Sequence, residues 1–297
     1  MSVSAVPRAR SSASPLIVGV VGAGRVGAVL GAALTAAGHS VVAAAAVSAA
    51  SRDRAARLLP GAAILPADDV ARAATDLLLL AVPDDALAGV VAGLAATGAL
   101  RPGQIVTHTS GAHGLAVLGA VEGMALHPAM TFTGDDGDLA RLPGIAWGVT
   151  ARDRAFATRL VADLGGVPEW VAEDARPLYH AALAHGANHL VTLVNEAADL
   201  LRGAGVEEPA RVLSPLLHAA LDNALRLGDA ALTGPVSRGD AGTVGKHLDR
   251  LPADAVPAYL ALARRTADRA IAAGRLRPQD AVALLDVLSR AAVGSSL

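Results

Sequence analysis

Three glycines lie within six residues near the start of the chain. In the segment GAGRVG they are Gly22, Gly24 and Gly27, between an apolar stretch and an alanine-rich stretch. A first glycine permits a tight turn, a second lets the backbone approach a pyrophosphate, and a third allows a helix to pack closely on a strand. The following helix offers free N–H groups to phosphates. This spacing predicts a dinucleotide site rather than a purely structural turn. The residues predicted to bind are Gly22, Ala23, Gly24, Arg25, Val26 and Gly27.

The segment after the second predicted strand indicates which dinucleotide binds. An NAD site usually places Asp or Glu about 20 residues after the glycines, where it bonds the ribose 2′-hydroxyl. Here that position offers Ser48, Ser51, Arg52 and Arg54, with no acid before Asp53. Hydroxyl and guanidinium groups suit a 2′-phosphate, which favours NADP(H) over NAD. The alternative is that the arginines only form a solvated helix face.

Further candidates follow other predicted strands, at the edge where ligands bind in open α/β sheets. Val82 and Pro83 come directly after an apolar strand and are predicted to line the cofactor site. Ser110, in HTSGAHG, could hydrogen-bond a carbonyl oxygen, and His127 could donate a proton. The alternatives are turn chemistry at Ser110 and a plain strand end at His127.

Predicted strands and helices alternate over the first half of the chain, which implies a mostly parallel sheet covered on both faces. From Glu173 onward the strand signals vanish and the period is helical. We therefore expect an α/β protein with a disordered tail over 1–14, a Rossmann-type doubly wound domain over 15–172 and an all-helical domain over 173–297. The predicted strands are residues 16–21, 41–47, 62–65, 77–82 and 105–107, one each in GMALHPAMTF and GIAWGVTA, and 167–171. The predicted helices of this half are 25–37, a helix capped by Ser51 and ending at 59, one that begins at 84, and 153–164.

Composition excludes several kinds of site and partner. The chain has 297 residues, no cysteine and a formal net charge of −2. Disulfides, thiolate catalysis and Cys-ligated metals are therefore excluded, and a nucleic-acid partner is not expected. His185 and His189 have the spacing of metal ligands, but no third ligand is evident and no metal is predicted. The absence of a membrane-length apolar run and of a signal segment leads us to expect a cytoplasmic protein without a membrane partner.

The order of the motifs resembles one bacterial family. GAGRVG, LLLLAVPDDAL, HTSGAHG and ALHPAMTF are followed by a helical half that carries LTGPVSRGD. This order is similar to Rossmann-like proteins with a C-terminal domain of the DUF2520 type, over nearly the whole chain after residue 15. More distantly it resembles pyrroline-5-carboxylate reductases, ketopantoate reductases and the 6-phosphogluconate dehydrogenase superfamily. The resemblance implies an NADP-linked oxidoreductase whose helical domain, like that of 6-phosphogluconate dehydrogenase, forms a homodimer.

The helical half departs from a pattern of the wider superfamily. Several relatives carry a catalytic lysine four residues before a substrate-positioning asparagine; here Asn188 is present, but Ala184 takes the place of the lysine. We expect Asn188 to position the substrate and His180 to act as proton donor instead. At 100° per residue the polar side chains fall on one arc, which could line a cleft or form an ordinary wet helix face. That arc comprises His185, Asn188, Thr192 and Asn195.

The turn LTGPVSRGD offers a candidate anchor for a carboxylate. Arg238 in this turn could bind a substrate carboxylate bidentately, or have only a surface role, and Asp240 could cap the next helix. Lys246 is the only lysine of the chain and is expected to be solvated.

These observations predict an NADPH-dependent oxidoreductase that reduces a small polar carbonyl compound, a carboxylate-bearing 2-oxo acid, with ketopantoate as a candidate from the resemblance. An imine reductase of the pyrroline-5-carboxylate type is the first alternative, although AHGANHL lacks the Gly-Pro-x-Tyr-like element of that family. A non-catalytic NADP-binding sensor is the second, because a fold does not by itself establish chemistry.

Overall fold

The computed structural model describes residues 14–294, which divide into two compact units. The first ends at Gly186 and the second begins at Ala187. Of the predicted tail, residues 1–13 lie outside the described residues. The last strand ends at Trp170, close to the predicted domain boundary of 172, whereas the first unit continues to Gly186 because the next helix packs its first turns on the sheet.

The first unit is built on one sheet in the strand order β3-β2-β1-β4-β5-β6-β7-β8. Neighbouring strands are parallel except β6 and β7, which run antiparallel. All the predicted strands are present, so the predicted α/β fold with a mostly parallel sheet is confirmed. The strands are β1 (Ile17–Val21), β2 (Ser40–Ala45), β3 (Ala63–Ile64), β4 (Leu77–Leu80), β5 (Ile105–His108), β6 (Gly123–Pro128), β7 (Ala146–Ala151) and β8 (Val167–Trp170).

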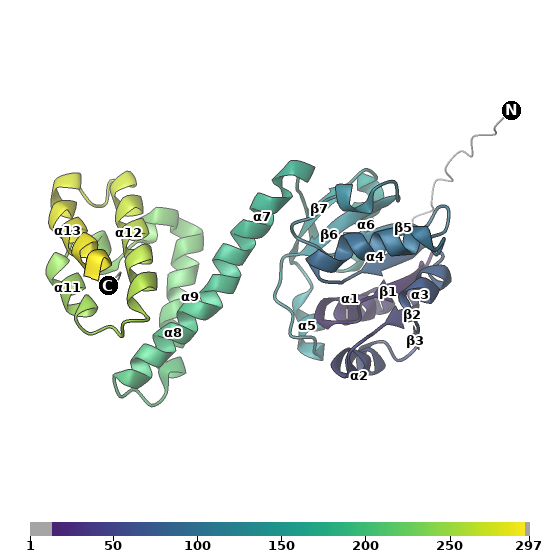
Figure 1. The fold of residues 1–297 in the computed structure, drawn as a ribbon, viewed down its shortest axis with the longest axis horizontal. Helices are drawn as coiled ribbons and strands as arrows, with labels where there is room; N and C mark the ends of the chain where they lie inside the picture. The colour runs from purple at the N-terminus through teal and green to yellow at the C-terminus, as the bar shows by residue number, and fades with distance from the viewer. Residues whose placement is uncertain (1–13, 295–297) are drawn as a thin grey trace. The chain divides into compact units, whose positions relative to one another are not determined.

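Two apolar cores cover the two faces of this sheet. Val20 belongs to one core and its neighbour Val21 to the other, because successive side chains of a strand point to opposite faces. The first core also holds Trp147 and the second Leu87, and Figure 1 shows helices on both faces. The helices of this unit are α1 (Arg25–Ala36), α2 (Ala49–Leu58), α3 (Ala67–Ala73), α4 (Asp84–Ala96), α5 (Asp136–Arg141), α6 (Arg154–Asp163) and α7 (Arg176–Leu183).

One predicted helix cap is wrong by three residues. Helix α2 begins at Ala49 and is capped by Ser48, whose hydroxyl accepts a hydrogen bond from the Ser51 amide at 3.1 Å. A cap lies outside the helix and accepts from its first turn, so the serine nearer the strand takes this role and Ser51 lies inside the first turn.

The second unit is all-helical, as predicted. Its helices are α8 (His189–Gly203), α9 (Pro209–Leu227), α10 (Gly234–Ser237), α11 (Ala241–Leu248), α12 (Val256–Ala272) and α13 (Pro278–Gly294). A third apolar core, which includes Val244, Leu260 and Leu284, joins α11, α12 and α13. Asp240 caps α11 by accepting from the Thr243 amide at 3.0 Å, which confirms that prediction.

A π-helical segment, Ala184–Asn188, joins α7 to α8. The predicted polar arc assumed 100° per residue from His185 to Asn195, and this spacing is wrong for His185 because a π turn bonds residue i to i+5 and contains more residues. His185 therefore has a different phase relative to Thr192 from the one that an α-helix would give.

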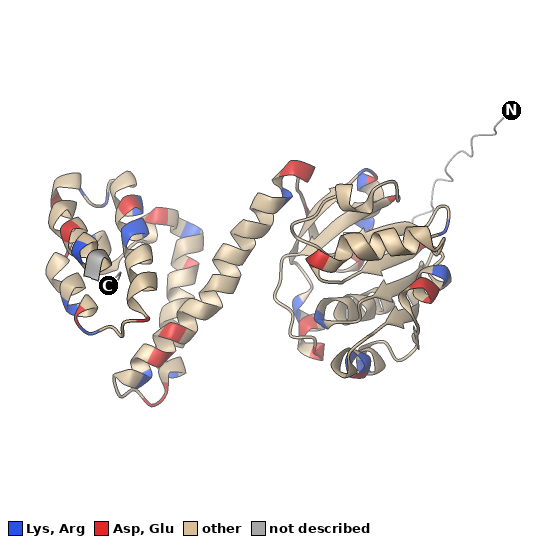
Figure 2. Ribbon diagram, in the orientation of Figure 1, with Lys and Arg blue, Asp and Glu red and all other residues tan. Residues whose placement is uncertain are grey.

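Charged residues of both signs occur in each unit, as Figure 2 shows. Residues 177–195, which include most of α7 and the start of α8, contain no Asp, Glu, Lys or Arg. Among the described residues, no helix combines the length and apolarity that crossing a membrane requires.

Candidate functional site

The three glycines of the loop after β1 have three different environments. Gly22 has φ +92°, and a Cβ there would lie 2.6 Å from the Ala81 carbonyl oxygen. A Cβ on Gly27 would overlap the Gly22 carbonyl oxygen, so α1 can approach the strand only with glycine at this position. Gly24 is different, because its Cβ would meet nothing nearer than the Gly22 oxygen at 3.9 Å. The fold itself therefore requires glycine at positions 22 and 27. At position 24 it does not, and the open space there suits a ligand.

The start of α1 fits an anion. Gly24 is the N-cap, no side chain caps the helix, and its first turn contains no acid. The amides of Gly22 and Ala23 bond the Ala45 carbonyl at 3.2 and 2.9 Å, which fixes the loop on the end of β2. A helix N-terminus with uncapped N–H groups and a positive dipole end favours phosphate. The predicted loop residues, Gly22 to Gly27, thus form a cradle that would hold the pyrophosphate of a dinucleotide.

The predicted 2′-phosphate residues gather at the start of α2. The Ser51 hydroxyl donates to the Ser48 carbonyl at 2.8 Å, and an Arg52 guanidinium nitrogen donates to the carbonyl of Val47, whose side chain is 91% exposed. No carboxylate lies between the end of β2 and Asp53, so none stands where a ribose 2′-hydroxyl is usually bonded.

The loop after β6 bonds two arginines of α2, the predicted Arg54 and also Arg57. Arg54 and Arg57 both donate to the Gly134 carbonyl, at 3.2 and 2.9 Å. Gly134 has φ +86°, and a Cβ there would lie 2.8 Å from Cγ of Arg25. The buried Asp138 fixes this loop by accepting from the Gly134 amide at 2.7 Å. Sequence reasoning missed this loop, which packs directly against the first helical residue of the glycine cradle.

Val82 and Pro83, which are predicted to line the cofactor site, follow β4, and Val82 lies beside the glycine loop. The Val82 Cγ1 atom is 3.2 Å from the position of a Cβ on Gly22. Pro83 is the N-cap of α4, whose first turn carries Asp84. These residues link the glycine loop to the next strand end along the sheet edge.

Ser110 is buried at the end of β5 and takes part in two hydrogen bonds. Its Oγ accepts from the His113 amide at 3.0 Å, and its carbonyl accepts from the Arg176 guanidinium at 2.6 Å. Arg176 also donates to the Thr150 hydroxyl at 3.0 Å, and its burial lowers the pKa of its guanidinium. A hydroxyl that accepts can still donate its own proton. Arg176 was missed by sequence reasoning; its place before a proline at the start of a helix gave no sign of burial.

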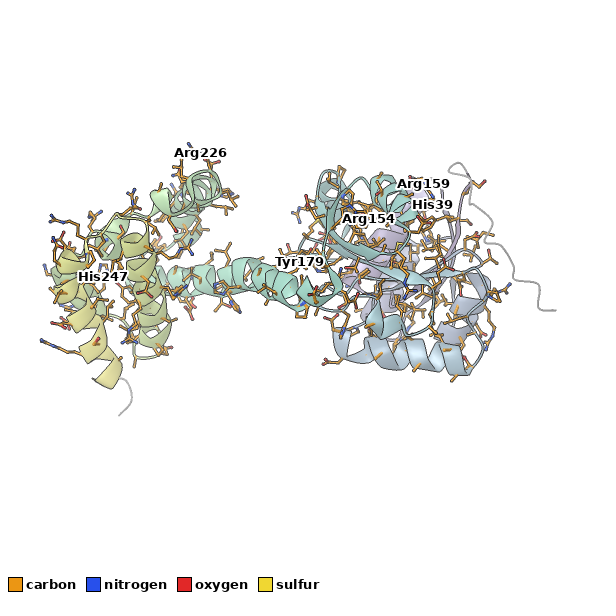
Figure 3. All side chains as sticks on the ribbon, turned by 90° about the horizontal axis from the view of Figure 1, so that it is seen from above. His39, Arg154, Arg159, Tyr179, Arg226 and His247 are labelled. Carbon is orange, nitrogen blue, oxygen red and sulfur yellow. The ribbon has the colours of Figure 1, made fainter. Side chains whose placement is uncertain are left out.

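A histidine and tyrosine cluster forms next to Ser110. His127, at the end of β6, has its Nδ1 atom 3.0 Å from the Tyr179 hydroxyl of α7. The rings of His127 and His180 lie edge to face with centroids 5.9 Å apart. A Cβ on Gly111 would lie 2.6 Å from the His180 ring and 3.1 Å from that of His127. The structure therefore brings together the predicted Ser110, His127 and His180, and adds Tyr179, which is labelled in Figure 3.

Burial controls the protonation of this edge. It lowers the pKa of His127 from 6.5 to about 4, and the neighbouring charges of His180 and Arg176 act in the same direction. His127 is therefore neutral at neutral pH, where it can donate a hydrogen bond but is not an imidazolium acid. Burial also lowers the pKa of His108, behind Ser110, to about 4, and raises that of Tyr179.

A carboxylate just before α7, which sequence reasoning also missed, bonds the end of the loop HTSGAHG. Glu173 accepts from the amides of Leu115 and Ala116 at 2.7 and 2.9 Å, and these bonds lower its pKa although partial burial acts in the opposite direction. A Cβ on Gly114 would overlap this carboxylate, which explains the last glycine of the motif.

Two predicted site residues lie in the second unit. Asn188 ends the π-helical segment, and Arg238 is exposed after α10, where its amide bonds the Pro235 carbonyl at 3.2 Å. Both stay predictions. Among residues 14–294 no group of three or more His, Asp or Glu side chains is arranged to hold a metal ion.

Comparisons with known proteins agree with this architecture. A Rossmann-like domain matches residues 6–129, and the domain of unknown function DUF2520 matches residues 145–266. No curated protein matches the chain.

Solved structures share the fold at low identity. A Bacteroides fragilis protein with the provisional name NADP oxidoreductase is 22% identical, with a TM-score of 0.71 over 86% of this chain and 98% of that one. Pyrroline carboxylate reductase from Plasmodium falciparum, with NADP bound, is 10% identical, with a TM-score of 0.56 over 91% and 98%. A reductive aminase from Aspergillus terreus, in complex with NADPH and ethyl levulinate, is 19% identical, with a TM-score of 0.57 over 95% of each chain. The chain thus joins a Rossmann-like domain to a DUF2520 domain, as the order of its motifs indicated.

Proposed function

We propose that the protein is an NADPH-dependent oxidoreductase that reduces a small polar carbonyl compound, with 2-oxo acids as the substrate class. The observation that carries this proposal is the open position at Gly24, in a glycine loop whose other two glycines the fold itself requires. Structures of the same fold from other organisms are named with NADP or NADPH bound, which supports the cofactor class.

The residues of the first unit fit such a cofactor. The uncapped amides from Gly24 onward would hold its pyrophosphate, and Ser48, Ser51 and Arg52 would hold a 2′-phosphate. When bound, NADPH supplies the two electrons of the reduction as a hydride. An Arg52 guanidinium, with no competing carboxylate before Asp53, favours the phosphorylated cofactor over NADH.

Two donors of the chain suit a carbonyl oxygen. The Ser110 hydroxyl and the neutral imidazole of His127 lie at the ends of adjacent parallel strands, on the sheet edge that also carries the glycine loop. Fixed donors near a developing oxyanion are an effective way to lower the barrier of carbonyl reduction. His180, or a water held by Ser110, then supplies the proton to the product oxygen, since His127 is not charged at neutral pH. Asn188 and Arg238 remain our candidates for positioning the substrate and its carboxylate.

The test mixes the full-length protein and NADPH with each member of a panel of 2-oxo acids, including ketopantoate, and of cyclic imines. The oxidation of NADPH is measured by its absorbance. We expect turnover with at least one 2-oxo acid, and a loss of turnover in Ser110→Ala and His127→Gln. Turnover with the imines alone would favour the imine-reductase alternative. Binding of NADPH without any turnover across the panel would contradict an enzymatic role and favour a sensor.

We also propose that the second unit forms a homodimer. Large apolar side chains on α8 and α9 are exposed in the single chain: Val191 by 58%, Leu216 by 62%, Leu221 by 51% and Leu225 by 82%. A patch of this kind marks a protein interface more often than a free surface. Light scattering should give twice the mass of the chain, and Leu216→Glu with Leu225→Glu should give the mass of one; a monomeric wild-type protein would refute the proposal.

A further inference from the structure

Both tyrosines of the chain contact a histidine in the same way. The Tyr179 hydroxyl lies 3.0 Å from Nδ1 of His127, and the Tyr259 hydroxyl lies 2.8 Å from Nδ1 of His247. Each ring pair is edge to face, at 88° and 86°, with centroids 5.6 and 5.9 Å apart. The first pair lies at the ligand-binding edge of the sheet, whereas the second lies in the second unit, where Figure 3 labels His247. The second pair is therefore a natural control for the first.

The backbone of β7 fixes the position of Tyr179. Gly148 is directly opposite His127 in the antiparallel ladder of β6 and β7. A Cβ on Gly148 would lie 2.5 Å from the Tyr179 hydroxyl, so that any other residue would push the hydroxyl away from the histidine. Glycine at this position is what allows the phenol to reach Nδ1.

The surroundings of the phenol decide the direction of its hydrogen bond. Burial raises the pKa of Tyr179, so the phenol keeps its proton at neutral pH. The phenol proton then needs an acceptor, and among the described residues the one within reach is Nδ1 of His127. Leaving the proton of this half-buried hydroxyl unbonded would lower the stability of the folded protein.

We propose that Tyr179 is a positioning residue for His127. Its hydroxyl donates a hydrogen bond to Nδ1 and thereby holds the neutral ring in the Nε2–H tautomer. The Nε2–H group is then free to donate a hydrogen bond to the carbonyl oxygen of the substrate. The substrate in this assignment rests on the proposed function, but the tautomer is a property of the protein alone. Nε2 is the ring atom next to Cδ2, the edge that Gly111 contacts, and it has no partner among the described residues.

The groups around His127 agree with a neutral ring. His180 and Arg176 on α7 disfavour a positive charge there, and burial acts in the same direction. Asp84 at the start of α4 opposes them with a smaller effect. A neutral imidazole with one fixed N–H can stabilise an oxyanion without giving up a proton, which assigns the proton transfer to another group.

The tautomer can be measured directly in the protein without any ligand. Nitrogen-15 NMR of the histidine rings, with His127 assigned through His127→Gln, should show Nε2 protonated and Nδ1 unprotonated at neutral pH. Tyr179→Phe should convert His127 to a mixture of tautomers, whereas Tyr259→Phe should change the signals of His247 and leave those of His127 as they are. A protonated Nδ1 in the wild-type protein, or His127 signals that are the same in Tyr179→Phe, would overturn the proposal.

Kinetics provide the second readout. With an active 2-oxo acid, Tyr179→Phe should lower kcat by about 10- to 100-fold, the size expected for a misplaced catalytic group, and leave the KM for NADPH unchanged. Tyr259→Phe should keep the wild-type kcat. A Tyr179→Phe enzyme with full kcat would refute the positioning role. If the wild-type protein reduces nothing, the proposed function fails, whereas the NMR result still decides where the proton of His127 lies.

Discussion

Acid should destabilise the first unit through His108, and the size of the effect follows from its burial. His108 is 0% exposed, its Nε2 lies 2.9 Å from the Gly114 carbonyl oxygen, and its Nδ1 has no partner among the described residues. Burial lowers its pKa from 6.5 to about 4. In the unfolded chain the ring takes up a proton near its ordinary pKa, whereas in the folded unit it does so only near pH 4.

The sign and magnitude follow from this difference. Because the unfolded state binds the proton first, the free energy of unfolding falls as the pH drops below 6.5 and levels off below about 4. At about 1.36 kcal/mol per pKa unit, His108 should account for a loss of about 2 kcal/mol between pH 7 and pH 5, and about 3 kcal/mol by pH 4. His127, whose pKa is also lowered to about 4, should add a similar loss.

The assay is urea unfolding followed by tryptophan fluorescence at several pH values. Both tryptophans, Trp147 and Trp170, belong to the first unit, so the signal reports its unfolding. His108→Gln should be less stable at pH 7 but should lose about 2 kcal/mol less than wild type between pH 7 and pH 5. His218→Gln, at an exposed histidine, removes no buried ring and is the matched control. Equal losses in wild type and His108→Gln would refute the reasoning.

Three further substitutions test other parts of the structure. Gly27→Ala places a Cβ against the Gly22 carbonyl and should lower the free energy of unfolding by about 1–3 kcal/mol or more, measured by the same fluorescence assay. Arg52→Ala should weaken NADPH binding by about 10-fold or more and leave NADH binding unchanged, since it removes a charge-assisted bond to a phosphate; equal losses for both cofactors would contradict its role. Arg176→Met leaves the Ser110 carbonyl without its buried donor and should cost about 3 kcal/mol in urea unfolding, whereas full stability would show that this bond is dispensable.

Local patterns in the sequence account for the parts of the fold that were predicted. The run Leu77–Leu80 could be predicted as a buried strand because all its residues are apolar, as expected for a strand covered on both faces. The glycine loop was equally predictable, since the roles of Gly22 and Gly27 depend on a turn and a contact a few residues away. The end of α2 was predicted to within one residue, but its cap was not, because Ser48 and Ser51 are both competent caps.

The rest depends on contacts between residues far apart in the chain. Tyr179 meets His127 across 52 positions, and Arg176 meets Ser110 across 66. No nearby sequence pattern indicates the role of Tyr179 or Arg176. Their contacts form only when α7 packs on the sheet edge. The π-helical segment Ala184–Asn188 had no sequence signal either, which is why a helical wheel extended through it misplaces His185.

Cofactor binding to a variant at Gly24 tests the central claim most directly. Calorimetry on the full-length protein should show that NADPH binds more tightly than NADH, and that Gly24→Val, whose side chain enters the open space of the loop, folds normally but no longer binds NADPH. Gly93→Val, at an exposed glycine of α4 with open space around it, should bind as wild type does. A wild-type protein without affinity for NADPH, or a Gly24→Val protein that retains it, would contradict the claim that this loop holds the cofactor.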